Sequence, residues 1–459
     1  MSTEARLKSS EVNAYGSALF GFNLMMQMNT MYFAFFLTDM ALIPAAMMGT
    51  ILMICRIGDM VMVPIVSGLM EKINLPWGRF RSWLAIGGPI LAVFFTAMFI
   101  DPPIGSITGK IVYYVTVYWI AHVMVNFTYA ALYGLVPVLG KHPDDRTLVS
   151  ARRNQYYSAA GVAFGMIAMP IILFFSGGPK PTQNGFTLTV ALFTLIMVIT
   201  YYLAFRVTKQ HDLPTTLDPK TAKQSGLTAG EMWSQVIQNP PFMAMIVGDI
   251  CRATALFGVA GVAAYYFRYV ANDMKSISIF FTTAGLIQFG SAMIFPYIAK
   301  IIDKRNLYVL AHVIVLISQV AAWLFADNSM TFTILVGISY MGISFASSAS
   351  PAMFADTCDY GEWKTGKNAR GFIMSMANMP PKVALIATGA FTGFALASMG
   401  YVPNAPASPE LMEGIRNLIH LVPAGAGLIG IVVVSLFNKL TVKKVQQLQK
   451  EIETRNVTA

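Results

Sequence analysis

Ionisable side chains lie inside long apolar stretches of this chain, where they are energetically costly. Arg56 and Asp59 stand three residues apart, and Asp249 and Arg252 repeat that spacing in the opposite order. Lys382 follows two consecutive prolines. A charge at the centre of a membrane helix costs about 2.5–3.5 kcal/mol on insertion scales, so such residues normally face a partner or an aqueous cavity. These five are the first candidates for proton transfer, ion binding or recognition of a charged solute.

Each of the two pairs admits two interpretations, because residues at i and i+3 share one helix face. Arg56 and Asp59 either neutralise each other, or Asp59 carries a proton or cation with Arg56 as its counter-ion. Asp249 and Arg252 either form a structural ion pair, or Asp249 takes part in coupling while Arg252 meets a carboxylate of the solute. The planar guanidinium suits carboxylates.

The composition is that of a membrane protein. Of the 459 residues 56% are hydrophobic and only 12% are charged, and the mean hydropathy is +0.59. Soluble domains are about 25% charged, so the composition excludes a soluble enzyme, a disordered chain and a secreted disulfide scaffold. Cys55, Cys251 and Cys358 are far apart in the sequence and indicate neither disulfides nor a metal cluster.

Largely charge-free stretches long enough to cross a bilayer recur along the whole chain. We predict twelve membrane helices, at 12–38, 42–70, 82–101, 110–139, 153–177, 184–206, 241–268, 276–300, 306–326, 329–354, 371–398 and 416–438. With both tails on one side, that side holds 24 of the 32 Lys and Arg residues and the opposite side 5. The excess predicts a multi-pass protein of the inner (plasma) membrane with both termini in the cytoplasm.

The chain is predicted to divide into two six-helix bundles. We expect an N-terminal bundle at 1–206, a cytoplasmic linker at 207–240, a C-terminal bundle at 241–438 and a basic tail at 439–459. The linker is interpreted as a plain tether, with a regulatory site as the alternative. Two spacings recur in both halves: Pro64 precedes Glu71-Lys72 as Pro296 precedes Asp303-Lys304, and Pro137 precedes Asp145 as Pro351 precedes Asp359. They indicate parallel repeats, with the solute bound near the midplane between the halves.

The repeated charges lie at the cytoplasmic ends of the predicted helices. They are either solvated surface residues or a gate whose acid–base pairs bridge helix ends while the cytoplasmic side is closed. The repeated spacing favours a gate formed by Glu71, Lys72, Asp145, Asp303, Lys304 and Asp359.

Motifs in both halves resemble the glycoside–pentoside–hexuronide:cation symporter family of the major facilitator superfamily. They are Ala14-Tyr15-Gly16, Phe36-Leu37-Thr38-Asp39, Arg56-Ile57-Gly58-Asp59, Trp77-Gly78-Arg79-Phe80-Arg81-Ser82-Trp83, His142-Pro143-Asp144-Asp145-Arg146 and Ala355-Asp356-Thr357-Cys358-Asp359-Tyr360-Gly361-Glu362-Trp363. The resemblance implies an all-α fold of twelve transmembrane helices and solute transport by alternating access. It also implies a role in solute binding or coupling for Lys382, and Arg153, seven residues after Arg146, completes the resemblance of the loop between the fourth and fifth helices.

Three family carboxylates are replaced in this chain. Val63 stands at the second acidic position of helix 2, Asn23 at an often acidic position of helix 1, and Tyr129 at the sugar-binding acid of helix 4. Sodium prefers several oxygen ligands that include charge, so we favour proton coupling through Asp59 or Asp249 over sodium, with uncoupled diffusion as the alternative. The solute site is predicted to consist of Asn23, Tyr129, Tyr133, Arg153, Arg252 and Lys382.

Cations outnumber acids among the predicted cavity residues, which favours an anionic small solute such as a hexuronide. An exporter of amphipathic compounds is the alternative. The sequence holds no P-loop, nucleotide fingerprint or catalytic triad, so we expect no enzyme activity, no cofactor, no metal and no nucleic-acid partner. We expect a monomer in contact with membrane lipid. His122, His312 and His420 are interpreted as packing or interfacial residues.

Overall fold

The computed structural model describes residues 8–73, 75–139, 143–212, 234–366, 373–374, 376–377 and 379–458, and all regular secondary structure in these ranges is helical. The first half forms α1 (Ser9–Phe35), α2 (Ala45–Lys72), α3 (Arg81–Ala97), α4 (Ile107–Leu139), α5 (Pro143–Ser176) and α6 (Gln183–Val207). The second half forms α8 (Pro240–Tyr265), α9 (Ser276–Ile298), α10 (Lys304–Phe325), α11 (Ser329–Thr365), α13 (Met379–Ser398) and α14 (Pro409–Phe437). A final helix, α15 (Val442–Thr458), follows α14.

The twelve predicted spans correspond to these twelve helices of the two halves. In the described part of the chain, ten helices are long and apolar enough to cross a membrane. Of the other two, α3 is a shorter apolar helix of 17 residues and α1 has 27 residues. The protein is therefore a multi-pass membrane protein built from helices.

Several predicted helix ends were wrong by seven residues or more, and one of them is the start of α14, which lies at Pro409 rather than at 416. The α5 helix begins at Pro143 rather than at 153, and α11 ends at Thr365 rather than at 354. The predictions stopped where charged residues begin, but a helix that leaves the hydrocarbon keeps its hydrogen bonds in water, so it continues through polar sequence. The predicted loops around Asp145 and Asp359 are helical extensions for this reason. The predicted tail also contains the helix α15.

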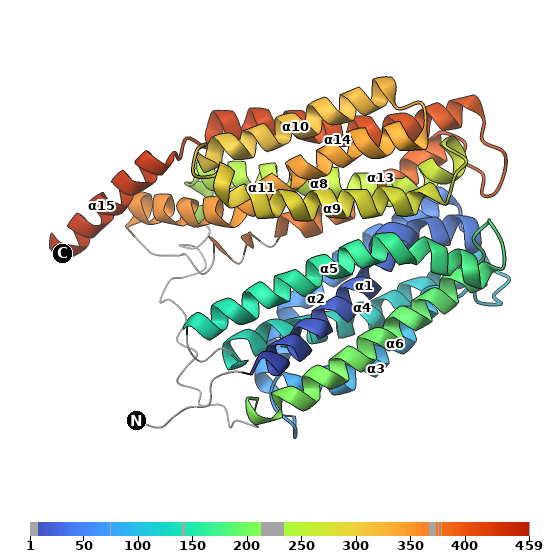
Figure 1. Cartoon of the computed structure of the whole chain (residues 1–459), viewed down its shortest axis with the longest axis horizontal. Coiled ribbons are helices and arrows are strands. Elements are labelled where there is room, and N and C mark those ends of the chain that lie inside the picture. Colours follow the sequence, from blue (N-terminus) through green and yellow to red (C-terminus); the bar gives the residue numbers. More distant parts are fainter. Residues whose placement is uncertain are drawn as a thin grey trace. The chain divides into compact units, whose positions relative to one another are not determined.

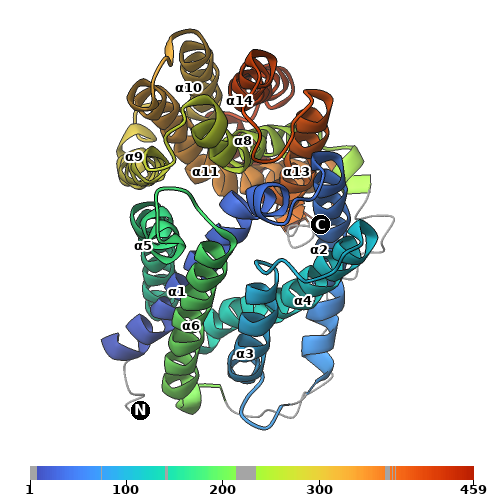
Figure 2. The same cartoon turned by 90° about the vertical axis from the view of Figure 1, so that its right-hand side faces the viewer.

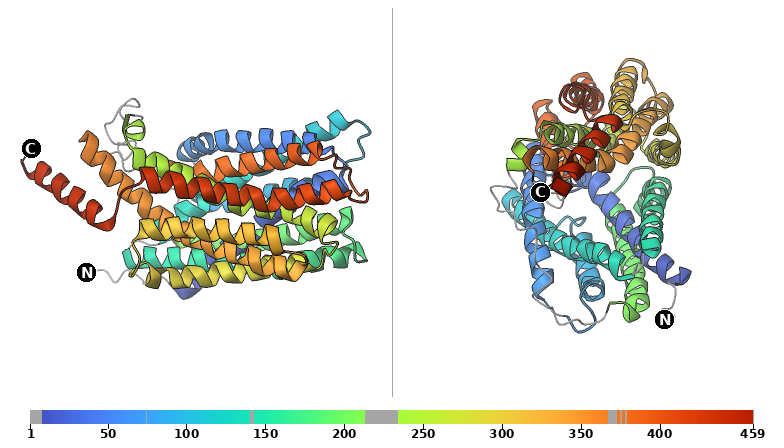
Figure 3. Two further views of the ribbon diagram at one scale, coloured as in Figure 1. Left: turned by 90° about the horizontal axis from the view of Figure 1, so that it is seen from above. Right: turned by 90° about the vertical axis from the view of Figure 1, so that its left-hand side faces the viewer.

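The chain forms two compact units. The first comprises residues 1–218, 273–282 and 393–406, and the second comprises 219–272, 283–392 and 407–459. Figure 1 shows α1–α6 gathered in one bundle and α8–α14 in another. Within each bundle the helices run side by side, as the end-on view of Figure 2 and the side view of Figure 3 show.

The two halves share a local irregularity that supports the internal repeat. The α1 helix continues into a π-helix at Phe36–Met40, and α8 continues into a π-helix at Tyr266–Val270. Two residues after each π-helix the backbone turns left-handed, at Leu42 with φ 58° and at Asn272 with φ 50°. These features recur 230 positions apart, so the first helix of each half ends in the same way.

A carboxylate holds the start of α3 in the first unit. Asp212 accepts hydrogen bonds from the backbone N–H groups of Arg79 (3.2 Å), Phe80 (2.8 Å) and Arg81 (2.7 Å). Gly78 has φ +129°, and a Cβ there would lie 2.3 Å from the carbonyl oxygen of Asp212. Only glycine fits this close approach, which explains the Trp-Gly-Arg-Phe-Arg segment as a docking point for the chain that follows α6.

Candidate functional site

A cluster of aromatic side chains and one arginine lies within the first unit. The guanidinium of Arg153 on α5 stacks on the ring of Tyr133, 3.7 Å from its centroid. The hydroxyl of Tyr133 is 2.9 Å from that of Tyr129, one turn earlier on α4. The ring of Tyr129 in turn stacks on Phe22 of α1 at 5.3 Å. Helices α1, α4 and α5 thus converge on this group.

The predicted residue Asn23 lies next to the same group. Its amide donates a hydrogen bond of 2.7 Å to the carbonyl oxygen of Tyr157 on α5, one turn after Arg153. Four of the six predicted solute-binding residues therefore lie in one neighbourhood of the first unit: Asn23, Tyr129, Tyr133 and Arg153.

The charge of Arg153 is not neutralised by any described residue. Its Nε is buried and has no hydrogen-bond partner, and none of the described acids lies within ion-pair distance of it. Leaving a buried donor unsatisfied costs about 1–3 kcal/mol. An arginine held over a tyrosine ring with an unused Nε donor can bind a carboxylate or sulfonate through two parallel N–H···O bonds. The surrounding rings can stack on the apolar face of a sugar.

Asp59 of α2 lies in a second group of the first unit. The amide of Asn126 on α4 donates a 2.7 Å hydrogen bond to Asp59. Arg56 is buried and lies within electrostatic range of both Tyr118 and Asp59. A pocket of about 700 Å³ reaches Asp59 and His122, but Ile, Val and Met side chains form most of its walls. This lining suits a lipid chain better than a sugar.

The second unit contains the pair Asp249 and Arg252 on α8. Nε of Arg252 donates to Asp249 at 2.7 Å and Nη2 donates to its other oxygen at 3.0 Å. Nη1 donates to the hydroxyl of Ser347 on α11 at 2.9 Å. The predicted pairing is thus present and bidentate. Lys382 lies on α13, directly after Pro380 and Pro381, and is partly exposed.

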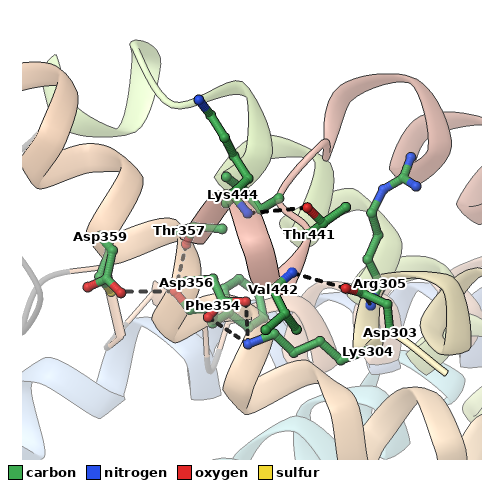
Figure 4. A network of polar contacts seen from close by, with 12 residues as sticks. Asp303, Lys304, Arg305, Phe354, Asp356, Thr357, Asp359, Thr441, Val442 and Lys444 are labelled. Atoms are coloured by element: carbon green, nitrogen blue, oxygen red, sulfur yellow. Dashed lines mark hydrogen bonds and ion pairs between the residues drawn. The ribbon is translucent and has the colours of Figure 1, made fainter. Parts of the chain in front are cut away.

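The predicted gate residues of the second unit form a polar network with α11 and α15 (Figure 4). Lys304 pairs with Asp356 at 2.7 Å. Asp303 accepts hydrogen bonds from the backbone N–H groups of Arg305 (2.9 Å) and Val442 (3.0 Å), and so joins the starts of α10 and α15. The side chain of Gln449 on α15 donates to Asp359 at 2.7 Å. The side chains of the other predicted gate residues, Glu71, Lys72 and Asp145, lie outside the described residues.

Sequence reasoning missed several partners at these sites. Asn126 lies three residues before Tyr129, and a polar residue one turn from a predicted site residue was a usable signal. Asp356 belongs to one of the family motifs, but its pairing with Lys304 spans 52 residues. Ser347 carries no signal in the sequence, because serine commonly bonds its own helix backbone.

Comparisons with known proteins identify the type of molecule. A family model described as MFS/sugar transport protein matches residues 14–440. An uncharacterized symporter of Bacillus subtilis is 27% identical over 99% of this chain and 97% of its own length. An Escherichia coli protein proposed to import sulfoquinovose is 26% identical over 98% of this chain and 95% of its own length. A glucuronide carrier protein homolog of E. coli is 24% identical over 94% of this chain and 93% of its own length.

Solved structures share the fold. A bacterial homologue of the iron transporter ferroportin, in its inward-facing state, has a TM-score of 0.67 over 96% of this chain and all of its own, with 14% sequence identity. At that identity the likeness concerns the fold alone. Together with the matching family model it confirms the predicted major facilitator architecture and the resemblance to the sugar symporters.

Proposed function

Since this chain belongs to the MFS/sugar transport protein family and is therefore a secondary transporter of sugar-like solutes rather than an enzyme, we propose that its solute is an anion. The class we favour is a hexuronide or a related sugar acid, taken up by alternating access. The solute-binding residues we propose are Asn23, Tyr129, Tyr133 and Arg153 in the first unit, and Arg252 and Lys382 in the second unit.

The observation that carries this proposal is the guanidinium of Arg153. It lies on the Tyr133 ring and keeps an unsatisfied, buried Nε. A neutral glycoside would leave that charge desolvated without an opposite charge, which is unfavourable in a membrane protein. The carboxylate of a uronide or the sulfonate of a sulfosugar would supply it. Two relatives carry names that refer to such anions, glucuronide and sulfoquinovose.

Coupling to protons is the second part of the proposal. Asp59 accepts a hydrogen bond from the amide of Asn126, and the side chain of Val63 has no oxygen at the position where a second carboxylate would help to bind sodium. A single carboxylate can still exchange a proton. We therefore propose proton symport through Asp59 or Asp249, with the counter-ion Arg56 beside the former. Sodium coupling and uncoupled diffusion are the competing outcomes of the test.

The third part of the proposal concerns membrane topology. The excess of Lys and Arg on one side of the predicted spans places both termini in the cytoplasm in this proposal, with the chain in the inner (plasma) membrane as a monomer. Glu71, Lys72, Asp145, Asp303, Lys304 and Asp359 would line the cytoplasmic gate.

Reconstituted proteoliposomes test the proposal. We expect counterflow of a labelled glucuronide that unlabelled uronides inhibit and neutral galactosides do not. An inward proton gradient should drive accumulation, and a protonophore should abolish it. Inhibition by galactosides but not by uronides would refute the anionic solute. Accumulation that follows sodium would refute proton coupling, and so would counterflow that persists without a gradient alongside uptake that neither a pH gradient nor a protonophore changes. Net efflux would establish an exporter.

A further inference from the structure

One buried histidine of the second unit has an arrangement that a neutral imidazole does not satisfy. In His312 on α10, Nδ1 is 3.0 Å from the carbonyl oxygen of Tyr308, and Nε2 is 3.2 Å from the carbonyl oxygen of Gly248 on α8. A carbonyl oxygen only accepts hydrogen bonds, and a neutral imidazole has one N–H. In the neutral ring, one nitrogen lone pair therefore points at an oxygen lone pair. The imidazolium form donates to both oxygens.

The other two buried histidines of the membrane helices do not lie between two acceptors, although Nε2 of His420 is buried and has no hydrogen-bond partner in the described structure. In His122, Nδ1 faces the carbonyl oxygen of Tyr118 at 3.1 Å, and Nε2 faces the amide nitrogen of Asn29 at 3.2 Å. One nitrogen donates and the other accepts. In His420, Nδ1 lies 3.0 Å from the side-chain oxygen of Gln319 and donates to it. His312 alone of these three lies between two oxygens that can only accept.

The surroundings of His312 prevent the ring from relieving this contact. A Cβ on Gly430 of α14 would lie 2.2 Å from Cδ2 of the imidazole, so the ring packs directly against the α14 backbone. The side chain is buried. A void beside it, bounded by Cys251, Arg252 and Gly342 among others, is too narrow for a water molecule. Neither ring rotation nor a bridging water can replace a proton here.

Few ionisable groups face His312 in the described part of the chain. Tyr308 comes from its own helix, and Asp249, Cys251 and Arg252 come from α8. Described residues of α11 and α14 near the ring are small or apolar, apart from Ser347, which binds Arg252. Asp249 and Arg252 neutralise each other, so a proton on His312 gives this group a net charge of +1.

A second unsatisfied group lies in the same place. The hydroxyl of Tyr308 is fully buried and has no hydrogen-bond partner in the described structure. It lies over Gly248, since a Cβ on that glycine would be 3.2 Å from the hydroxyl oxygen. Tyr308 is also within electrostatic range of both Asp249 and Arg252. If Arg252 moves away from Asp249, the unpartnered Tyr308 hydroxyl can donate a hydrogen bond to the Asp249 carboxylate.

We propose that His312 is a proton-binding site of the transport cycle. It takes up a proton from solution to become an imidazolium, and this positive charge weakens the ion pair between Asp249 and Arg252. The added positive charge repels the guanidinium and attracts the carboxylate, so Arg252 becomes available to an anionic solute. Proton binding and anion binding then favour each other, and one proton with one monovalent anion moves without net charge. This coupling rests on the proposed function, but the protonation of His312 does not.

Nitrogen NMR of the histidine rings tests protonation without any solute. The chain has only five histidines, so ¹⁵N-histidine labelling of the full-length protein in lipid nanodiscs gives few signals. At a pH near 6 we expect a signal from a doubly protonated ring that is lost in His312→Gln and retained in His420→Gln, with the signals of the other two histidines assigned through His142→Gln and His211→Gln. A His312 ring with one bare nitrogen throughout about pH 5 to 8 would overturn the proposal. If His312→Gln does not fold, the wild-type spectrum, assigned with Gln variants of the other four histidines, still shows whether the His312 ring carries two protons.

Transport separates the role of this proton from the proposed function. We expect His312→Gln to lose accumulation driven by a proton gradient while it retains counterflow, and His420→Gln to retain both. Gradient-driven accumulation by His312→Gln would show that the proton is structural and would overturn the coupling. If no uronide is transported by the wild type, the proposed solute is wrong, while the NMR result still decides whether His312 binds a proton.

Discussion

Replacement of Arg153 by lysine should separate recognition of an anion from recognition of a sugar ring. Lysine keeps the positive charge but loses the planar fork, so at least one of two parallel hydrogen bonds to a carboxylate is lost. A hydrogen bond to a charged group contributes about 1.5–3 kcal/mol. Because 1.4 kcal/mol is about a factor of ten, we expect the affinity for a uronide to fall about 10- to 150-fold.

The geometry around Arg153 supplies a matched control. Tyr133→Phe removes the 2.9 Å contact between the hydroxyls of Tyr129 and Tyr133 but keeps the ring beneath the guanidinium. A neutral hydrogen bond contributes about 0.5–1.5 kcal/mol, so this variant should weaken binding at most about tenfold. It should also affect a uronide and its neutral glycoside alike, since the charge stays in place.

Isothermal titration calorimetry of the purified protein measures both affinities. For Arg153→Lys the ratio of uronide to neutral glycoside affinity should fall, and a thermal unfolding scan without solute should confirm that the variant is folded. An unchanged ratio in a folded variant would show that Arg153 does not contact the anionic group, and the reasoning from its unsatisfied Nε would be refuted.

Two further predictions concern the structural framework. Asp212→Ala removes the acceptor of three backbone N–H groups at the start of α3, so we expect the protein to lose about 2–3 kcal/mol of stability, measured as a lower melting temperature in detergent. Asp212→Asn keeps an oxygen acceptor and should lose less stability, and equal melting temperatures for the wild type and both variants would contradict this. Hydrogen bonds from the side chains of Trp363 and Gln447 lower the pKa of Glu451 on α15. A lowered pKa means that this contact stabilises the docked helix above the ordinary Glu value of 4.5 and is lost as the pH falls through the lowered value. Hydrogen exchange of 442–458 should therefore increase below about pH 4, after correction for intrinsic rates, and Glu451→Gln should show the increase already at neutral pH; protection that is equal in both proteins at both pH values would refute it.

Several contacts besides the one at Glu451 hold α15 against the end of α11. Leu440, Val445 and Leu448 form a small apolar cluster with Tyr360 and Trp363 of α11. Arg455 donates to the carbonyl oxygens of Trp363 (3.1 Å) and Glu362 (2.9 Å), at the end of the same helix. These apolar contacts and hydrogen bonds hold the amphipathic helix α15 against α11.

The amino-acid sequence by itself determined the class of molecule. Long charge-free stretches can be satisfied in a bilayer only as helices, since every backbone polar group must find its partner within the segment. That constraint made the number and order of the helices readable from hydropathy. The motifs at the helix ends identified the family, because they depend on local residues such as Gly78, whose close approach to Asp212 allows no side chain.

The helix ends beyond the bilayer and the partners of the charged residues were decided by tertiary structure. Hydropathy reports where the hydrocarbon ends and not where a helix ends, so the extensions of α5 and α11 were not predicted. The sequence showed that Asp249 and Arg252 share a face, but Ser347 lies 95 residues from Arg252. The sequence favoured a packing or interfacial role for His312, and only the structure shows a carbonyl oxygen from α10 and one from α8 next to its two ring nitrogens. Whether a buried polar group is satisfied depends on which helix packs beside it, and spacing along one helix carries no record of that.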